Sequence, residues 1–325
     1  MGVNMNKYKN IIVILIIAAA FAVFFFVKGN EGYQDKIESL MKQGKYQDAI
    51  NYIDEKIKSG KEDDYLLGEK GYALISLNKN EEGIKVLEKA LTYNSKNDNI
   101  LNNISWAYNN LNKYDKALEY ADKALVINKN DAITLVNKGN AESGLNKPDE
   151  AIDSYSKALK IDKKSSLAYY GLALSYYDKE DYSKTLENLN KYVELKGEDY
   201  ESLYYIGDCY YYMDKYQDSL NYYDKALKLN DKEAFLHSFK ADSLYFLGKY
   251  DEAIISYQNA VKLDKDYADA YYGQALSYAM KSDKTNAIEY LKKAVKFDND
   301  YVGYAYNDDA FKDIKKSDEF KSLIK

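Results

Sequence analysis

The sequence predicts an all-α protein assembled from one repeated pair of helices. Three observations support this fold class: a Lys-Ala-Leu tripeptide recurs at multiples of 34 residues, eight units of 34 residues fill positions 30–301 without an insertion, and apolar residues recur at helical spacing inside each unit. The chain has one proline, so little interrupts the predicted helices. Copies of the tripeptide begin at Lys89, Lys123, Lys157 and Lys225.

Small residues recur at fixed positions of the unit, counted from Asn30. Small side chains let two helix axes approach closely, whereas bulky ones would push them apart. Position 8 carries Gly71, Ser105, Gly139, Ala173, Gly207, Ala241 and Ala275, and position 20 is equally restricted in size. Position 24 carries the larger Ile53, Leu87, Tyr155, Leu189, Tyr223, Tyr257 and Leu291, which we expect to form a stacked core.

Residues that tolerate left-handed backbone stand between the two predicted helices of several units. They are Gly44, Asn112, Asn146 and Gly248. The turn chemistry therefore has the same period as the core positions.

With these positions, the sequence resembles the tetratricopeptide repeat (TPR) family, whose unit is two antiparallel helices. The resemblance implies a right-handed α-solenoid of eight hairpins. Residues 302–325 contain a capped amphipathic pattern, which predicts a helix that covers the last hairpin. No unit has the proline common in the family at position 32, so softer turns between repeats are expected. The implied repeats are 30–63, 64–97, 98–131, 132–165, 166–199, 200–233, 234–267 and 268–301.

An apolar run precedes the repeats. Residues 11–27 are all Ile, Val, Leu, Ala or Phe. As a helix this run spans roughly 25 Å, enough for a short transmembrane anchor. We expect residues 1–10 to form a cytoplasmic tail, the protein to reside in the cell membrane, and the array to be extracytoplasmic. The alternatives are a cleaved signal peptide, with Ala18 and Ala20 as its small residues, and a cytoplasmic array, which the excess of lysines after the run favours.

The composition argues against several classes of function. The chain has 46 basic and 52 acidic residues and no arginine, which disfavours nucleic acid as a partner. Single Cys209 and His237 residues cannot build a disulfide or a metal site of their own kind. Repeats without insertions leave no closed pocket for catalytic groups, so we expect neither enzymatic activity nor a cofactor.

In the family, positions 2, 5, 6, 9, 12 and 13 of each first helix line the concave face, and the resemblance places only one lysine, Lys42, at these positions. In the second half of the array the same positions are aromatic and acidic. Tyrosine gives a large contact area, and carboxylates attract lysine or arginine, so a protein or extended peptide, basic or apolar, is the implied partner. The candidate residues are Tyr170, Tyr177, Tyr204, Asp208, Tyr211, Tyr212, Asp242, Tyr245 and Tyr272.

A second candidate group lies in the third and fourth units. Asn102, Asn103 and Asn137 accompany Trp106, and amide side chains can bond both groups of a peptide backbone. Of these, Asn103 and Asn137 resemble an asparagine ladder that lines the superhelix of some family members.

These features favour a membrane-tethered scaffold that binds partner proteins or peptides in its concave groove. The alternative function is a glycan-binding surface module that stacks sugars on the tyrosines. A third interpretation is that many of the 37 tyrosines only pack between hairpins.

Overall fold

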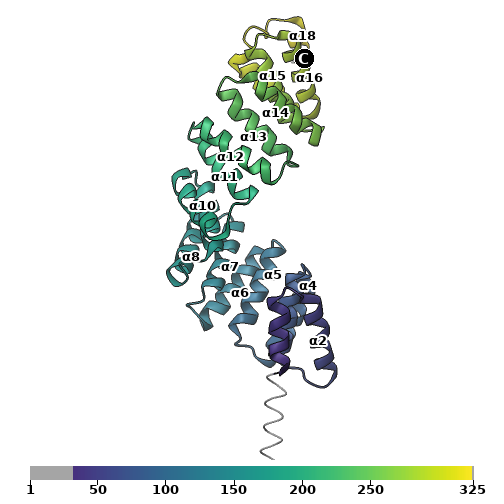
Figure 1. Ribbon diagram of the computed structural model, residues 1–325, viewed down its shortest axis with the longest axis vertical. Coiled ribbons are helices and arrows are strands. Elements are labelled where there is room, and N and C mark those ends of the chain that lie inside the picture. The colour runs from purple at the N-terminus through teal and green to yellow at the C-terminus, as the bar shows by residue number, and fades with distance from the viewer. Residues whose placement is uncertain (1–31, 324–325) are drawn as a thin grey trace, which may run out of the picture. The chain divides into compact units, whose positions relative to one another are not determined.

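The computed structural model describes residues 32–323, and this part of the chain contains helices and turns with no strand. The prediction of an all-α fold is confirmed. The chain forms two compact units, Met1–Lys147 and Pro148–Lys325. In Figure 1 the helices of each unit follow one another in chain order, each beside the next.

The first unit is a stack of helical hairpins. Its first helix covers residues 32–42 in the described part. Neighbouring helices pack as antiparallel pairs, α3 with α4 and α5 with α6. The remaining helices of this unit are α2 (Tyr46–Lys58), α3 (Asp64–Ser76), α4 (Asn80–Tyr93), α5 (Asp98–Asn110), α6 (Tyr114–Ile127) and α7 (Ala132–Gly144).

The second unit continues the same pattern, and each of its odd-numbered helices from α9 to α15 packs with the helix that follows it. Its helices are α8 (Pro148–Ile161), α9 (Ser166–Asp178), α10 (Tyr182–Lys196), α11 (Tyr200–Tyr212), α12 (Tyr216–Leu229), α13 (Ala234–Phe246), α14 (Tyr250–Leu263), α15 (Ala268–Met280), α16 (Lys284–Phe297), α17 (Tyr301–Asn307), the short 3-10 helix η1 (Asp309–Phe311) and α18 (Asp318–Leu323). From α3 to α15, each odd-numbered helix begins at the first residue of a predicted repeat.

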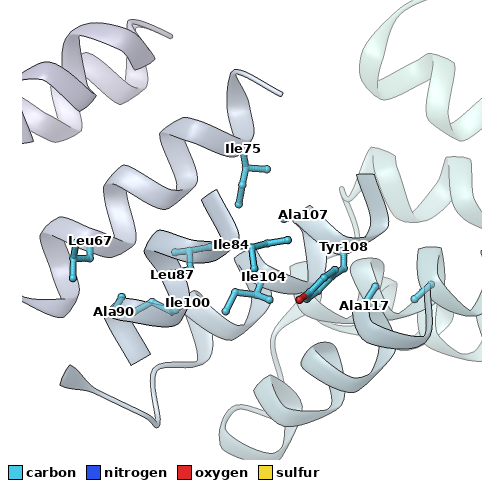
Figure 2. Packing of buried hydrophobic residues seen from close by; sticks show 11 residues of the cluster. Leu67, Ile75, Ile84, Leu87, Ala90, Ile100, Ile104, Ala107, Tyr108 and Ala117 are labelled. Atoms are coloured by element: carbon cyan, nitrogen blue, oxygen red, sulfur yellow. The ribbon is translucent and has the colours of Figure 1, made fainter. Parts of the chain in front are cut away.

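Small residues lie where helices cross, as the sequence suggests. A Cβ atom added to Gly71 would stand 2.4 Å from the Leu87 side chain, and one added to Gly207 would stand 2.9 Å from the Tyr223 ring. Figure 2 shows the core of the first unit, in which Leu87 lies among Ile75, Ile84 and Ile104. Since no space remains for even one methyl group, the size of position 8 is fixed by the residue at position 24.

The turn inside each hairpin has a left-handed residue at position 15 of the unit. It is Gly44, Asn78, Asn112, Asn146, Glu180, Asp214, Gly248 and Ser282 in the eight turns. Glycine and asparagine accept this conformation readily, whereas glutamate and serine adopt it at a cost. The period of the repeat, rather than residue type alone, therefore sets this geometry.

The C-terminal segment packs against the last hairpin. Phe311, Ile314 and Phe320 are buried in one cluster with Ala287 and Leu291. These residues cover apolar surface that the last hairpin would otherwise leave in water.

Within residues 32–323, no helix has both the length and the apolarity that a membrane crossing requires. The predicted anchor at residues 11–27, and the tail before it, lie outside the described residues.

Exchanging residues at position 15 should change stability in opposite directions. Glu180 has a φ of 59°, so Glu180→Gly should raise the free energy of unfolding by about 0.5–1 kcal/mol. Gly248 has a φ of 75° and open space around its Cβ position, so Gly248→Ala should lower it by about 1 kcal/mol through backbone strain alone. Urea unfolding followed by circular dichroism measures both, and equal responses would contradict this account.

Candidate functional site

A cavity of about 330 Å³ opens between the first helices of three consecutive hairpins in the second unit, α11, α13 and α15. Four of the residues predicted from the sequence line it, namely Tyr211, Asp242, Tyr245 and Tyr272. Phe239, Phe246 and Leu276 add apolar wall, and Asp269 adds a second carboxylate. None of the described residues that line the cavity is a lysine. We refer to it as the α11/α13/α15 cavity.

Asp208 does not line this cavity, because its carboxylate is used inside the protein. Tyr177 donates its hydroxyl hydrogen to Oδ2, and the Tyr223 hydroxyl donates to Oδ1 at 3.1 Å. The residue is 1% exposed. Burial raises the pKa of Asp208, and the two tyrosine hydrogen bonds offset only part of this effect.

Asp242 occupies the same position one repeat later, in a more open setting. It accepts a hydrogen bond of 2.5 Å on Oδ1 from the Tyr257 hydroxyl and keeps partial contact with solvent. Burial raises the pKa of Asp242 to about 7; the Tyr257 hydrogen bond opposes this shift, and the negative charges of Asp269 and Asp208 add to it. Asp242 therefore changes charge near neutral pH.

Tyr257 and Tyr301 also line the cavity, and the sequence analysis did not select them as site residues. Tyr257 donates to Asp242, and Tyr301 donates to Asp269 on Oδ1. The signal for the first pair was present in the sequence, because an aspartate stands 15 residues before a position-24 tyrosine at Asp208 and again at Asp242.

The other predicted tyrosines of this unit have different roles. Tyr170 packs on Tyr192 with ring centroids 4.9 Å apart, and Tyr204 packs on Phe235 at 5.2 Å, so both mainly contribute to packing between helices. Tyr177 is engaged by Asp208. Tyr212 is 52% exposed and lies almost parallel to Tyr182, 5.1 Å between centroids.

The asparagine group belongs to the first unit, so the predicted site residues fall into two separate sets. Asn137 donates to Oδ1 of Asn102 at 2.7 Å, and both side chains are buried. Asn103 and Trp106 are half-buried, and Trp106 packs on Tyr72 with 5.7 Å between centroids. Asn102 and Asn137 thus satisfy each other, and peptide binding by this group stays a prediction.

Cys209 is buried, and burial raises the pKa of its thiol to about 12. A thiol that stays protonated at neutral pH is a poor nucleophile. Residues 32–323 contain no cluster of three or more His, Cys, Asp or Glu side chains arranged to hold a metal ion.

Stacked antiparallel hairpins with a cavity along their first helices define a helical-repeat interaction module. Models of the tetratricopeptide repeat match residues 69–132 and 240–302, a TPR repeat model matches 139–180, and a model of subunit 3 of the anaphase-promoting complex matches 178–260. The chain belongs to the tetratricopeptide repeat family. Comparison with curated protein sequences gives no match.

Three solved structures illustrate the similarity. The structure of YrrB, described as a TPR protein with an unusual peptide-binding site, is 30% identical, has a TM-score of 0.51, and aligns over 56% of this chain and 94% of its own. The C-terminal part of a TPR repeat-containing protein from Cytophaga hutchinsonii is 18% identical with a TM-score of 0.58, covering 79% and 99%. The Cut9–Hcn1 hetero-tetramer is 16% identical with a TM-score of 0.59, covering 90% and 55%. The last two show the fold alone.

Asp242→Asn should make stability less dependent on pH. Because the folded state raises the pKa of Asp242 from 3.8 to about 7, the folded protein holds this proton more tightly, and stability falls as the pH rises through that window. Asparagine does not titrate. The variant should match wild type near about pH 4 and exceed it by on the order of 1 kcal/mol at about pH 8, allowing for partial exposure.

Urea unfolding followed by circular dichroism measures this difference, since Trp106 reports on the first unit only. Asp218→Asn removes the same charge from an exposed position on α12 and is the matched control. A variant less stable than wild type at about pH 8 would contradict the raised pKa.

Proposed function

We propose that this protein is a membrane-tethered scaffold whose second unit binds a segment of a partner protein along the first helices of its hairpins. The single observation that carries the proposal is the α11/α13/α15 cavity, an opening with aromatic walls and two carboxylates. Aromatic side chains supply contact area at low entropy cost, and carboxylates select basic segments by charge. YrrB, a relative described as binding peptides, supports the same use of the fold.

The peptide is the preferred ligand because the exposed aromatic residues continue the cavity. Phe246 is 51% exposed and lies on Tyr216 with 4.8 Å between centroids and an 11° tilt. Tyr212 and Tyr182 form the equivalent pair one repeat earlier. An extended chain laid across these hairpins would meet one such pair per repeat.

The same pairs favour a second candidate function, binding of a glycan. Nearly parallel, half-exposed rings at regular spacing present flat apolar faces, on which sugar rings could stack. This candidate depends on Tyr212 and Phe246 and gives the carboxylates of the cavity no role, whereas a basic peptide uses both.

Site-directed photo-crosslinking in whole cells tests the partner. A crosslinking amino acid in place of Phe246 should give discrete adducts with another protein, because this side chain lies at the cavity and is exposed. The same amino acid in place of Ile255, which is 58% exposed on α14, should give none.

Adducts of the same pattern from both positions, or from neither, would refute the peptide-binding surface. Retention of the protein on purified cell-wall polysaccharide, lost in Tyr212→Ala and Phe246→Ala, would instead support the glycan-binding candidate.

Tethering rests on the apolar run at residues 11–27, and we place the repeats outside the cytoplasm. Lys163→Cys introduces a thiol at an exposed turn, whereas the native Cys209 is buried and serves as the internal control. A membrane-impermeant maleimide should label the variant, and not wild type, in intact cells. Labelling only after lysis would place the repeats in the cytoplasm, and release from the membrane fraction without removal of residues 11–27 would refute the tether.

A further inference from the structure

Two aspartates of the second unit stand at equivalent positions, Asp208 and Asp242, but the protein uses them differently. Asp208 has both oxygens bonded to tyrosine hydroxyls. For Asp242, the residue that corresponds to Tyr177 is Tyr211, and in the described chain Tyr211 makes no hydrogen bond to it. Oδ2 of Asp242 is therefore left without a protein donor among residues 32–323, at a side chain that lines the α11/α13/α15 cavity.

A second negative charge stands in the same cavity. Asp269 accepts one hydrogen bond from Tyr301, and its charge raises the pKa of Asp242. The described residues around the cavity supply no lysine to neutralise the two carboxylates. A cation from outside the chain would compensate both of them.

The rest of the lining consists of ring faces and edges. Phe246 lies edge to face with Tyr211 at 5.7 Å and with Tyr245 at 5.4 Å between centroids, and Tyr272 lines another side. Aromatic faces attract ammonium and guanidinium groups, and they also pack against the methylene stem that carries such a group. A volume of about 330 Å³ accommodates one side chain of this kind.

We propose that the α11/α13/α15 cavity is a pocket for one lysine or arginine side chain of the bound peptide, with Asp242 Oδ2 accepting a hydrogen bond from its cationic group. Asp269 supplies additional negative potential, and the rings of Tyr211, Tyr245 and Phe246 contact the stem. This inference rests on the proposed peptide-binding function, because the pocket fixes one residue of a segment that the groove holds.

The pocket makes binding depend on pH. Groups that face Asp242 are Tyr257, Asp269 and Asp208, with Tyr211 and Tyr245 across the cavity. Because its pKa is raised to about 7, Asp242 is partly protonated at neutral pH, and a bound cation would favour the charged form. Affinity should therefore fall as the pH is lowered through this range.

Selection from a random dodecapeptide library tests the pocket. The full chain, purified in mild detergent, would be immobilised as wild type, as Asp242→Asn and as Asp218→Asn. Asparagine keeps an oxygen for Tyr257 and removes only the charge of Asp242, and Asp218 is exposed on α12, outside the cavity. Peptides enriched on wild type should share a lysine or arginine at one position, and Asp242→Asn alone should lose this enrichment.

An enriched peptide, labelled for fluorescence anisotropy, gives the magnitude. Asp242→Asn should weaken its binding about tenfold or more, the loss of one charge-assisted hydrogen bond, and should abolish the pH dependence of affinity around pH 7. The same peptide with norleucine at the basic position should bind wild type and Asp242→Asn equally.

The outcomes separate the two hypotheses. Peptides enriched without a basic position, or a basic position that survives in Asp242→Asn, overturn the cation pocket and leave peptide binding intact. No enrichment on wild type above empty support overturns both. Loss of all enriched peptides in both Asp242→Asn and Asp218→Asn assigns the effect to net charge and also overturns the pocket.

Discussion

The structure depends on one steric constraint, the insertion of the position-24 side chain between first helices whose facing residue has no side chain. Leu87 fills the space beside Gly71 within its own hairpin, and Tyr257 fills the space beside Gly273 of the next hairpin, where an added Cβ would stand 2.2 Å from the ring. Dense packing leaves no tolerance for an extra methyl group at either place. Stacking of hairpins and closure of each hairpin are thus both limited by the same side chain.

This constraint explains why the fold was predictable from the sequence. A contact between a small residue and a large one must recur whenever the hairpin recurs, so it appears as a fixed period of 34 residues. The turns show where residue type stops being informative. Gly44 and Asn112 predict a left-handed turn by themselves, but Glu180 and Ser282 adopt the same conformation only because the helices on both sides require it.

The candidate site was less predictable, for a physical reason. The register of the repeat assigns Asp208 and Asp242 to equivalent positions, and nothing in either residue distinguishes them. Whether a carboxylate is free depends on which ring of the preceding hairpin reaches it, and Tyr177 reaches Asp208. Likewise, Asn102 and Asn137 look available in the sequence and are paired with each other in the structure. Such differences arise from side-chain positions that a repeat pattern does not encode.

The core and the cavity are linked through the tyrosines at position 24. In four consecutive repeats of the second unit, the residue at position 9 follows the residue at position 24. The paired residues are Leu174 with Leu189, Asp208 with Tyr223, Asp242 with Tyr257, and Leu276 with Leu291. A buried tyrosine hydroxyl needs an acceptor, whereas leucine does not, so the change from leucine to tyrosine in the core accompanies an oxygen in the groove.

That requirement accounts for an acceptor, but it does not account for a charge. A neutral asparagine or serine would satisfy the hydroxyl of Tyr257 at a lower desolvation cost than a carboxylate. At Asp208 the second oxygen is also consumed, by Tyr177, so the carboxylate serves two core tyrosines at once. At Asp242 no second tyrosine uses it among the described residues, and burial raises its pKa to about 7, which means that the charged form lowers the stability of the fold. The charge of Asp242 is therefore the part of this site that folding does not explain, and binding of a cation does.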